Sequence, residues 1–347
     1  MSATSPISSS ATEQRSQVSP FRLFQAINAY QLTDAIRSAI ELDVFTAIGA
    51  GQSNPGAVAR QCGIAERGAR MLCDFLVVHG FLTKSGQEYA LADDSAMFLD
   101  RKSPVYMGTC TRFLLHDALR QRFLELSDAV RYGGATDRMA LEPESSVWVD
   151  FARSMAPMMM MASQELSKLV IGNDTSPLKV LDIAAGHGLF GVAVLRANPN
   201  AMVTAVDWKN VIEVARENAE KFGVADRYRT LPGSIFDVDI GSGYNLVLIP
   251  NFLHHFDVET NEKLLRKLHG ALVPGGRVAT LEFVPNDDRI SPPMPATFAL
   301  IMLADTPAGD AYTRAELESM MRHAGFTAHE FHPMPPSPHS VLISRRE

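Results

Sequence analysis

The stretch LKVLDIAAGHGLFGVAVLRANP, residues 178–199, decides the fold of this chain. It begins with an apolar run that is typical of a buried strand, continues through a turn of small residues, and ends in a helical pattern that stops at Asn198-Pro199. A short apolar run, a glycine turn and a periodic helix in this order form the ligand-binding entry of a doubly wound sheet. The stretch therefore predicts an α/β domain whose ligand lies above the turn.

Two classes of ligand fit this turn. Residues 186–191, GHGLFG, match the dinucleotide fingerprint, and Asp207 follows at a spacing suited to a ribose. Asp182 argues against a pyrophosphate, because a carboxylate repels phosphate and attracts an ammonium group. S-adenosylmethionine (SAM) carries an amino-acid end and a ribose but no phosphate. The segment VLDIAAGHG resembles the first motif of class I SAM-dependent methyltransferases, which favours SAM over NAD; the plainer alternative is that the glycines only form a tight turn.

Composition and charge bound the remaining possibilities. The chain has 347 residues, enough for two domains, with 46% hydrophobic and 20% charged residues and no apolar run that approaches a membrane span. Residues 1–19 are polar and predict a disordered tail without an export signal. Three cysteines, an odd number without metal-ligand spacing, favour a reduced cytoplasmic protein. The net charge of -7 argues against a nucleic-acid surface.

The N-terminal part predicts helices followed by a small winged module. Residues 20–48 have helical apolar periodicity on a long flank that needs cover, either from its own domain or from a second copy of the chain. Residues 55–90 predict two short helices and a hairpin, the order of a winged helix. Three arginines (Arg60, Arg67 and Arg70) are candidates for DNA phosphate contacts, but acidic neighbours favour a solvated face.

The segment FQAINAYQLTDAIRSAIELDVFTAI, residues 24–48, together with the winged module, resembles the dimerisation domain of the caffeic acid O-methyltransferase-like family. The resemblance implies a homodimer, a winged helix without a DNA role, and four parts: a tail at 1–19, a dimerisation and winged-helix domain at 20–105, a helical linker and acceptor-pocket region at 106–172, and a SAM-binding domain at 173–347. The last is expected to be Rossmann-like, with a seven-stranded mixed sheet whose last strand is antiparallel.

Several polar residues fall at the carboxyl ends of predicted strands, where a parallel sheet presents its ligand. Asp207 is expected to accept the ribose hydroxyls, with helix capping as the alternative, and Trp208 to cover the sugar or adenine. Ser234 stands where the family carries an acidic residue for the adenine amino group, and Phe236 suits the apolar adenine wall; Asp237 is another possible acceptor. The predicted cofactor-binding residues are Asp182, Gly186, Gly188, Asp207, Trp208, Ser234, Phe236 and Asn251.

The catalytic prediction rests on LHHF, residues 253–256. In the resembled family a histidine at the position of His254 acts as general base, and an imidazole is suited to accept a hydroxyl proton near neutral pH. Glu282, at the end of another strand, is expected to orient it. Two alternatives stay open: His254 caps the next helix, or His255 faces the pocket instead. The second acidic residue of plant members has no match in GDAYTRAEL, residues 309–317.

A methionine-rich helix, residues 155–161, predicts a soft apolar pocket or simply a core helix interrupted at Pro157. In the resembled family the corresponding Phe-x-x-x-Met segment lines the acceptor pocket, which implies Phe151, Met155 and Met158 as acceptor-side residues. Phe298 and Met302 are expected to form the far wall of the pocket. The predicted function is SAM-dependent methylation of a hydroxyl on a small, aromatic acceptor, without metal, nucleic acid or membrane. The alternatives are C- or N-methylation on the same fold, an NAD enzyme, and a non-catalytic DNA-binding regulator.

Overall fold

The computed structural model describes residues 19–136 and 144–347, so nearly all of the predicted tail lies outside the described part. The chain divides into two compact units, one ending at Pro104 and the other running from Val105 to Glu347. Each unit has a hydrophobic core of its own.

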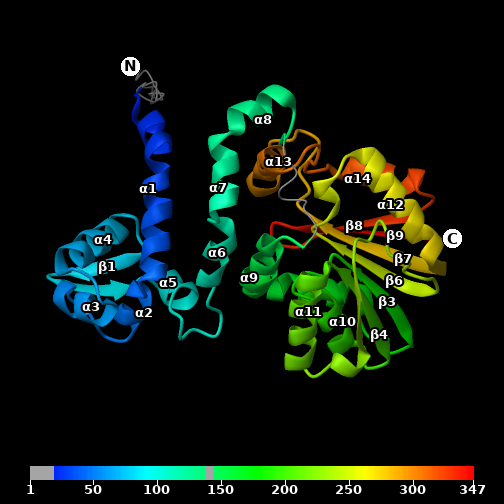
Figure 1. Cartoon of the computed structure of the whole chain (residues 1–347), viewed down its shortest axis with the longest axis horizontal. Helices are drawn as coiled ribbons and strands as arrows, with labels where there is room; N and C mark the ends of the chain where they lie inside the picture. The colour runs from blue at the N-terminus through cyan, green and yellow to red at the C-terminus, as the bar shows by residue number, and fades with distance from the viewer. Residues whose placement is uncertain (1–18, 137–143) are drawn as a thin grey trace, which may run out of the picture. The chain divides into compact units, whose positions relative to one another are not determined.

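The first unit is helical with one small hairpin (Figure 1). Its elements are α1 (Phe21–Glu41), α2 (Val44–Gly49), α3 (Pro55–Cys62), α4 (Glu66–Val78), β1 (Leu82–Ser85), β2 (Glu88–Leu91) and α5 (Asp93–Phe98). Asp43, with a positive φ of 60°, separates α1 from α2. The hairpin is antiparallel, as the winged-module prediction requires. The first turns of α1 expose large apolar side chains, namely Phe21, Leu23, Phe24, Ile27 and Tyr30.

The second unit begins with helices and continues as a regular α/β alternation. The leading helices are η1 (Gly108–Cys110), α6 (Thr111–Leu114), α7 (Asp117–Leu124), α8 (Leu126–Tyr132) and α9 (Ser146–Ile171). The alternating part comprises β3 (Leu178–Ile183), α10 (Leu189–Ala197), β4 (Ala201–Asp207), α11 (Lys209–Lys221), η3 (Ala225–Arg227), β5 (Tyr228–Pro232), β6 (Tyr244–Pro250), η4 (Leu253–His255), α12 (Val258–Ala271) and β7 (Leu272–Glu282). It closes with α13 (Pro293–Asp305), α14 (Arg314–His323), β8 (Thr327–Pro333) and β9 (Ser340–Arg345).

The predicted seven-stranded mixed sheet is confirmed. Its strand order is β5-β4-β3-β6-β7-β9-β8, and β9 runs antiparallel to both of its neighbours while the other pairs are parallel. The strands β4 and β6 lie on opposite sides of β3, so the strand order reverses at β3. Ligands of open α/β sheets bind at such a point.

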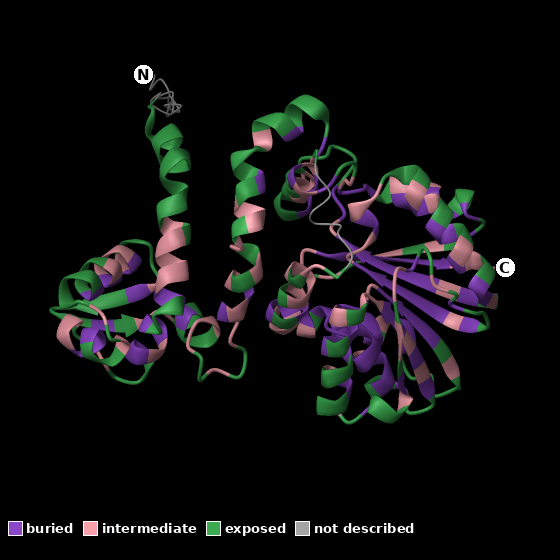
Figure 2. Ribbon diagram, in the orientation of Figure 1, coloured by how far each residue is buried: buried purple, intermediate pink, exposed green. Residues whose placement is uncertain are grey.

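Both faces of the sheet are covered, which is why its strands are almost continuously apolar. Alternate residues such as Val180 and Leu181 pack into different clusters on opposite faces. One cluster includes residues of α9, α10 and α11, and the other includes residues of α12 and α14. Figure 2 shows the central strands as the most buried part of this unit.

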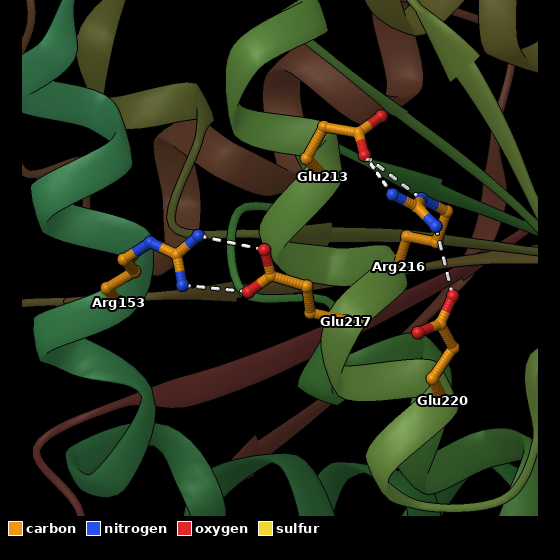
Figure 3. Close-up of polar contacts among 5 residues, drawn as sticks. All are labelled: Arg153, Glu213, Arg216, Glu217 and Glu220. Atoms are coloured by element: carbon orange, nitrogen blue, oxygen red, sulfur yellow. Dashed lines mark hydrogen bonds and ion pairs between the residues drawn. The ribbon is translucent and has the colours of Figure 1, made fainter.

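An exposed ion pair links α9 to α11 (Figure 3). The guanidinium of Arg153 donates to both carboxylate oxygens of Glu217, at 2.7 and 2.9 Å. On α11 itself, Arg216 pairs with Glu213 and Glu220 one turn before and after it. Because these side chains are about half exposed, solvent screens each pair and its contribution to stability is small. The link nevertheless aligns α9 with the helix that begins just after Asp207.

Candidate functional site

The turn after β3 is held in a conformation that requires glycine. Gly186 and Gly188 have φ angles of +55° and +72°. A Cβ on Gly188 would lie 2.9 Å from the Cα of Ala215 on α11, so the turn is seated directly against that helix. The main-chain N–H of Gly186 donates to Oδ2 of Asp207 at 2.7 Å, which ties the turn to the end of the neighbouring strand.

Asp207 has both carboxylate oxygens engaged by the main chain. Its Oδ1 accepts from the N–H of Trp208 at 2.7 Å, while Oδ2 accepts from Gly186. Burial raises the pKa of Asp207 to about 6, and the two N–H donors oppose that rise. Trp208, not Asp207, is the N-cap of α11, and its side chain makes no capping hydrogen bond. Each oxygen keeps a second lone pair that a hydroxyl of a ligand can use.

Asp182, which was expected to attract a ligand ammonium, lies beneath the turn in this structure. Its side chain is fully buried, and Oδ2 accepts from the N–H of Gly191 at 3.0 Å. Burial raises its pKa to about 8, with the charge of Asp207 adding to the rise. The carboxyl holds the start of α10 from under the turn, and its Oδ1 has no hydrogen-bond partner among the described residues.

Aromatic rings line the segment that follows β5. Phe236 is 38% exposed, and its ring centroid lies 5.1 Å from that of Phe256 and 6.3 Å from that of Phe252. The hydroxyl of Ser234 accepts from the N–H of Phe236 at 3.2 Å. Asp237 is exposed. These rings form an apolar wall on the same rim as Asp207, while Trp208 packs against α9 in a small cluster with Trp148.

Asn251, the first residue after β6, has a strained backbone and an unsatisfied amide. Its φ is +53°, which is uncommon outside glycine. Its Nδ2 lies 3.8 Å from the sulfur of Met159, and its Oδ1 is buried without a hydrogen-bond partner among residues 19–136 and 144–347. Strain and an orphaned polar atom together are typical of a ligand site. The glycine turn, the Asp207 carboxylate and this free amide oxygen fit the amino-acid end and ribose of SAM.

His254 and Glu282 form a buried pair at the ends of two adjacent strands. Nδ1 of His254 lies 2.5 Å from Oε2 of Glu282, and the two side chains are 7% and 5% exposed. The other carboxylate oxygen, Oε1, accepts from the main-chain N–H groups of Phe252 and Leu253 at 2.9 and 2.8 Å. Three donors therefore fix the carboxylate, and the carboxylate fixes the imidazole.

The two histidines differ in their contacts, and the helix-capping alternative for His254 is wrong. The N-cap of α12 is Asp257, whose Oδ1 accepts from the N–H of Thr260 at 2.7 Å, so His254 does not cap that helix. His255 packs edge-on against Trp148, with ring centroids 5.7 Å apart. Burial holds the pKa of His255 well below its ordinary value, and the neighbouring His254 adds to this. His254 is the histidine that carries a carboxylate partner.

Two of the predicted acceptor-side residues lie beside the features described above. The ring of Phe298 is 4.9 Å from that of His254, edge to face. A Cβ on Gly186 would lie 3.7 Å from Cε1 of Phe151, so Phe151 approaches the glycine turn.

The methionines of α9 differ in their surroundings. Met159 belongs to the sheet core and Met158 packs against it, whereas Met161 is exposed. Met155, and Met302 on α13, are buried.

Sequence reasoning missed the residues that support the site through hydrogen bonds to its main-chain oxygens. Nζ of Lys267 on α12 donates to the main-chain oxygens of Ile235 and Val238 at 2.7 and 2.8 Å, and so fixes the segment that carries Phe236. The N–H of Asp310 donates to the oxygen of His254 at 3.0 Å. Only the helical spacing of α12 could have placed Lys267 near that segment, and no local motif marks it.

Comparison with known proteins agrees with this architecture. Residues 139–327 match the O-methyltransferase domain and residues 24–101 match the O-methyltransferase dimerisation domain. The chain is 27% identical to the tetracenomycin polyketide synthesis 8-O-methyl transferase of Streptomyces glaucescens over 89% of this chain and 91% of the relative. It is 28% identical to the 3-hydroxy-5-methyl-1-naphthoate 3-O-methyltransferase of Streptomyces sahachiroi over 84% and 85%.

A solved structure extends the agreement over both units. A candidate O-methyltransferase from Nostoc punctiforme superposes with a TM-score of 0.92 at 51% identity, covering 95% of this chain and 100% of that one. The fold and the matches define the class as a SAM-dependent methyltransferase with an N-terminal dimerisation domain. The chain belongs to the O-methyltransferase family.

Family membership confirms three predictions made from the sequence: the O-methyltransferase family itself, the enzymatic activity, and SAM as cofactor. The dimerisation-domain match supports a homodimer, and the methyltransferase-domain match supports a small-molecule substrate. Within residues 19–136 and 144–347, no helix is long and apolar enough to cross a membrane. The same residues contain no group of three or more side chains suited to hold a metal ion.

Proposed function

We propose that this enzyme methylates a hydroxyl group of a small, aromatic acceptor, with His254 as general base and Glu282 as the residue that orients it. The observation that carries the proposal is the contact of 2.5 Å between Nδ1 of His254 and Oε2 of Glu282. Because Oε1 is occupied by two main-chain N–H groups, Oε2 is free to accept the Nδ1 hydrogen. Nε2 then carries a lone pair that can accept a proton.

Removing a proton is the main chemical task left to the protein. When bound, SAM supplies a methyl group already activated by a sulfonium. A phenol with a pKa of about 10 is a poor nucleophile until its proton is leaving. Nε2 of His254 takes that proton, and the Glu282 carboxylate stabilises the imidazolium that forms. The rings around His254 would exclude water and position an aromatic acceptor with its hydroxyl at Nε2.

The acceptor class is inferred from the rings that surround His254. Phe298 stands edge-on to it, and Phe151, Met155, Met158 and Met302 are the other residues that we assign to the acceptor side. Aromatic rings and methionine sulfur both favour a flat apolar acceptor. The naphthoate named for the Streptomyces sahachiroi relative belongs to the same chemical class.

We assign the cofactor to the rim formed by β3, β4 and β6. Gly186 and Gly188 would receive its amino-acid end, Asp207 its ribose hydroxyls and Asn251 a polar hydrogen through its free amide oxygen. Trp208, Ser234 and Phe236 would flank the sugar and adenine. Asp182 stays in this set only as a positioning residue beneath the turn.

The remaining proposals concern assembly and location. We retain the division at 20–105, 106–172 and 173–347, with the exposed apolar turns of α1 covered by a second copy in a homodimer. The arginines of the winged module are exposed, and Arg70 pairs with Asp74 at 3.3 Å, which supports a solvated face without nucleic acid. Three free cysteines support a reduced cytoplasmic protein that does not bind membranes.

Calorimetry and turnover test the proposal in sequence. S-adenosylhomocysteine (SAH) and NAD are titrated into the wild type and Asp207→Ala; SAH binding that weakens in the variant, with no binding of NAD, is expected. Phenolic acceptors are then screened with the wild type and with His254→Ala. His255→Ala is the matched control. Loss of turnover in His254→Ala but not in His255→Ala supports His254 as the general base. Methyl transfer to carbon or nitrogen, or full activity of His254→Ala, would contradict it.

A further inference from the structure

A second buried histidine, His339, lies at the edge of the site and has no role in the mechanism above. It directly precedes β9, whose first residue, Ser340, is paired in register with Glu282. Its ring centroid is 4.3 Å from that of Phe283. Phe283 stacks on Phe298 at 4.1 Å, and Phe298 is the ring that meets His254 edge-on. A continuous row of rings therefore runs from His254 to His339.

The hydrogen bonds of His339 leave one ring nitrogen unused. Nδ1 lies 2.8 Å from Oγ of Ser337, and the same Oγ accepts the main-chain N–H of His339 at 3.3 Å. Nδ1 is the one partner found for the Ser337 hydroxyl hydrogen among the residues described, so we assign Nδ1 as the acceptor. The ring hydrogen is then on Nε2. Nε2 is buried and has no partner in the described part of the chain, and His339 is only 3% exposed.

The electrostatic surroundings keep this ring neutral. Burial lowers the pKa of His339 to about 4; the Glu282 carboxylate opposes that shift and His254 adds to it. His339 is therefore uncharged near neutral pH, and it offers a single N–H donor inside an apolar wall. Native proteins rarely leave such a donor unsatisfied, and a ligand oxygen is one of the explanations to test.

We propose that Nε2–H of His339 donates a hydrogen bond to an oxygen acceptor, a ketone or quinone carbonyl, on the same aromatic substrate whose hydroxyl faces His254. This inference rests on the proposed function and narrows its substrate class to hydroxy-aryl carbonyl compounds. A site built to bond a substrate group discriminates against the analogue that lacks it, because the buried donor is then left unpaired. His339 is thus assigned to acceptor specificity and Phe283 to its support.

Matched acceptors and two variants test the assignment. The meta and para isomers of hydroxyacetophenone are compared with the corresponding ethylphenols, which differ from them in the carbonyl oxygen. In the wild type, kcat/KM should favour the ketones. His339→Phe keeps a ring against Phe283 and should reduce the preference by about tenfold, mainly through KM. His339→Gln keeps an N–H donor near the position of Nε2 and should restore part of the preference for the ketones. SAH affinity should be the same in all three proteins.

The outcomes that would overturn the proposed role of His339 can be told apart from one another. An equal preference in the wild type and His339→Phe, or an equal loss for both acceptor types together with weaker SAH binding, would assign His339 a structural role only. A wild type that binds SAH and methylates neither acceptor type would refute the acceptor class and this inference with it, whereas absent SAH binding would refute the proposed function. Nitrogen NMR of the His339 ring supplies a readout without turnover: a hydrogen on Nδ1 contradicts the assignment.

Discussion

Replacing Glu282 by glutamine tests the catalytic pair with the least disturbance of the fold. In Glu282→Gln the amide oxygen can still accept the two main-chain N–H groups that now bond Oε1, at 2.9 and 2.8 Å. The amide nitrogen then takes the position of Oε2 and donates to Nδ1 of His254. Nδ1 becomes an acceptor, so the ring hydrogen moves to Nε2 and the base is lost.

The size of the effect follows from what is removed. General-base catalysis contributes about 10²- to 10⁴-fold, so kcat of Glu282→Gln should fall within that range. The amide oxygen in Glu282→Gln keeps both main-chain donors. The three bonds that residue 282 makes lose their charge assistance but are retained, which costs about 1–3 kcal/mol of folding stability. SAH affinity should not change, because neither side chain of the pair is assigned to the cofactor.

Single-turnover methylation at saturating SAM, with SAH calorimetry beside it, measures these quantities. The matched control is Glu330→Gln on β8, where the carboxylate is half exposed and pairs with Arg345 at 3.1 Å; its activity should equal that of the wild type. If Glu282→Gln folds and retains kcat within about threefold of wild type, the carboxylate does not orient a catalytic base and the reasoning is refuted.

Three further predictions follow from the site and its supports. SAH affinity should fall as pH drops below about 6, because protonation of Asp207 removes the acceptor that the ribose needs; calorimetry of Asp207→Asn should show a flat profile, and the same pH dependence in the variant would contradict this. Gly188→Ala should destabilise by about 2–5 kcal/mol in denaturant unfolding, since an added Cβ meets the α11 backbone at 2.9 Å, whereas Gly223→Ala, with a similar φ and open space, should cost about 1–2 kcal/mol. Arg153→Ala breaks the exposed pair with Glu217 and should change stability by less than about 1 kcal/mol, with the difference shrinking in high salt; a salt-independent loss above that would show a packing role.

The fold could be predicted because its signals are local. The continuous apolar run that includes Val180 and Leu181, the glycine turn and the helix that ends before Pro199 each follow from a few neighbouring residues. The pairing of His254 with Glu282 could also be predicted, since Glu282 ends one strand, His254 follows another, and such strand ends meet on one rim.

Other features of the site depend on information that is not local. The sequence shows a carboxylate at Asp182 near the glycines, but only the packed structure shows that it is fully buried and directed to Gly191. His339 meets Phe283 through the pairing of β7 with β9, and the antiparallel direction of that pair says nothing of its register. Lys267 reaches the segment after β5 from a helix whose rotation the apolar pattern fixes only coarsely.

The measurement that tests the central claim most directly is carbon NMR of the product formed from SAM labelled with carbon-13 in its methyl group. The wild type and His254→Phe are each incubated with the labelled cofactor and the acceptor that the screen identifies. The account predicts a methoxy resonance in the wild type that is lost in the variant, while SAH binding is retained. A label on carbon or nitrogen, or a methoxy signal of equal strength in the variant, would contradict it.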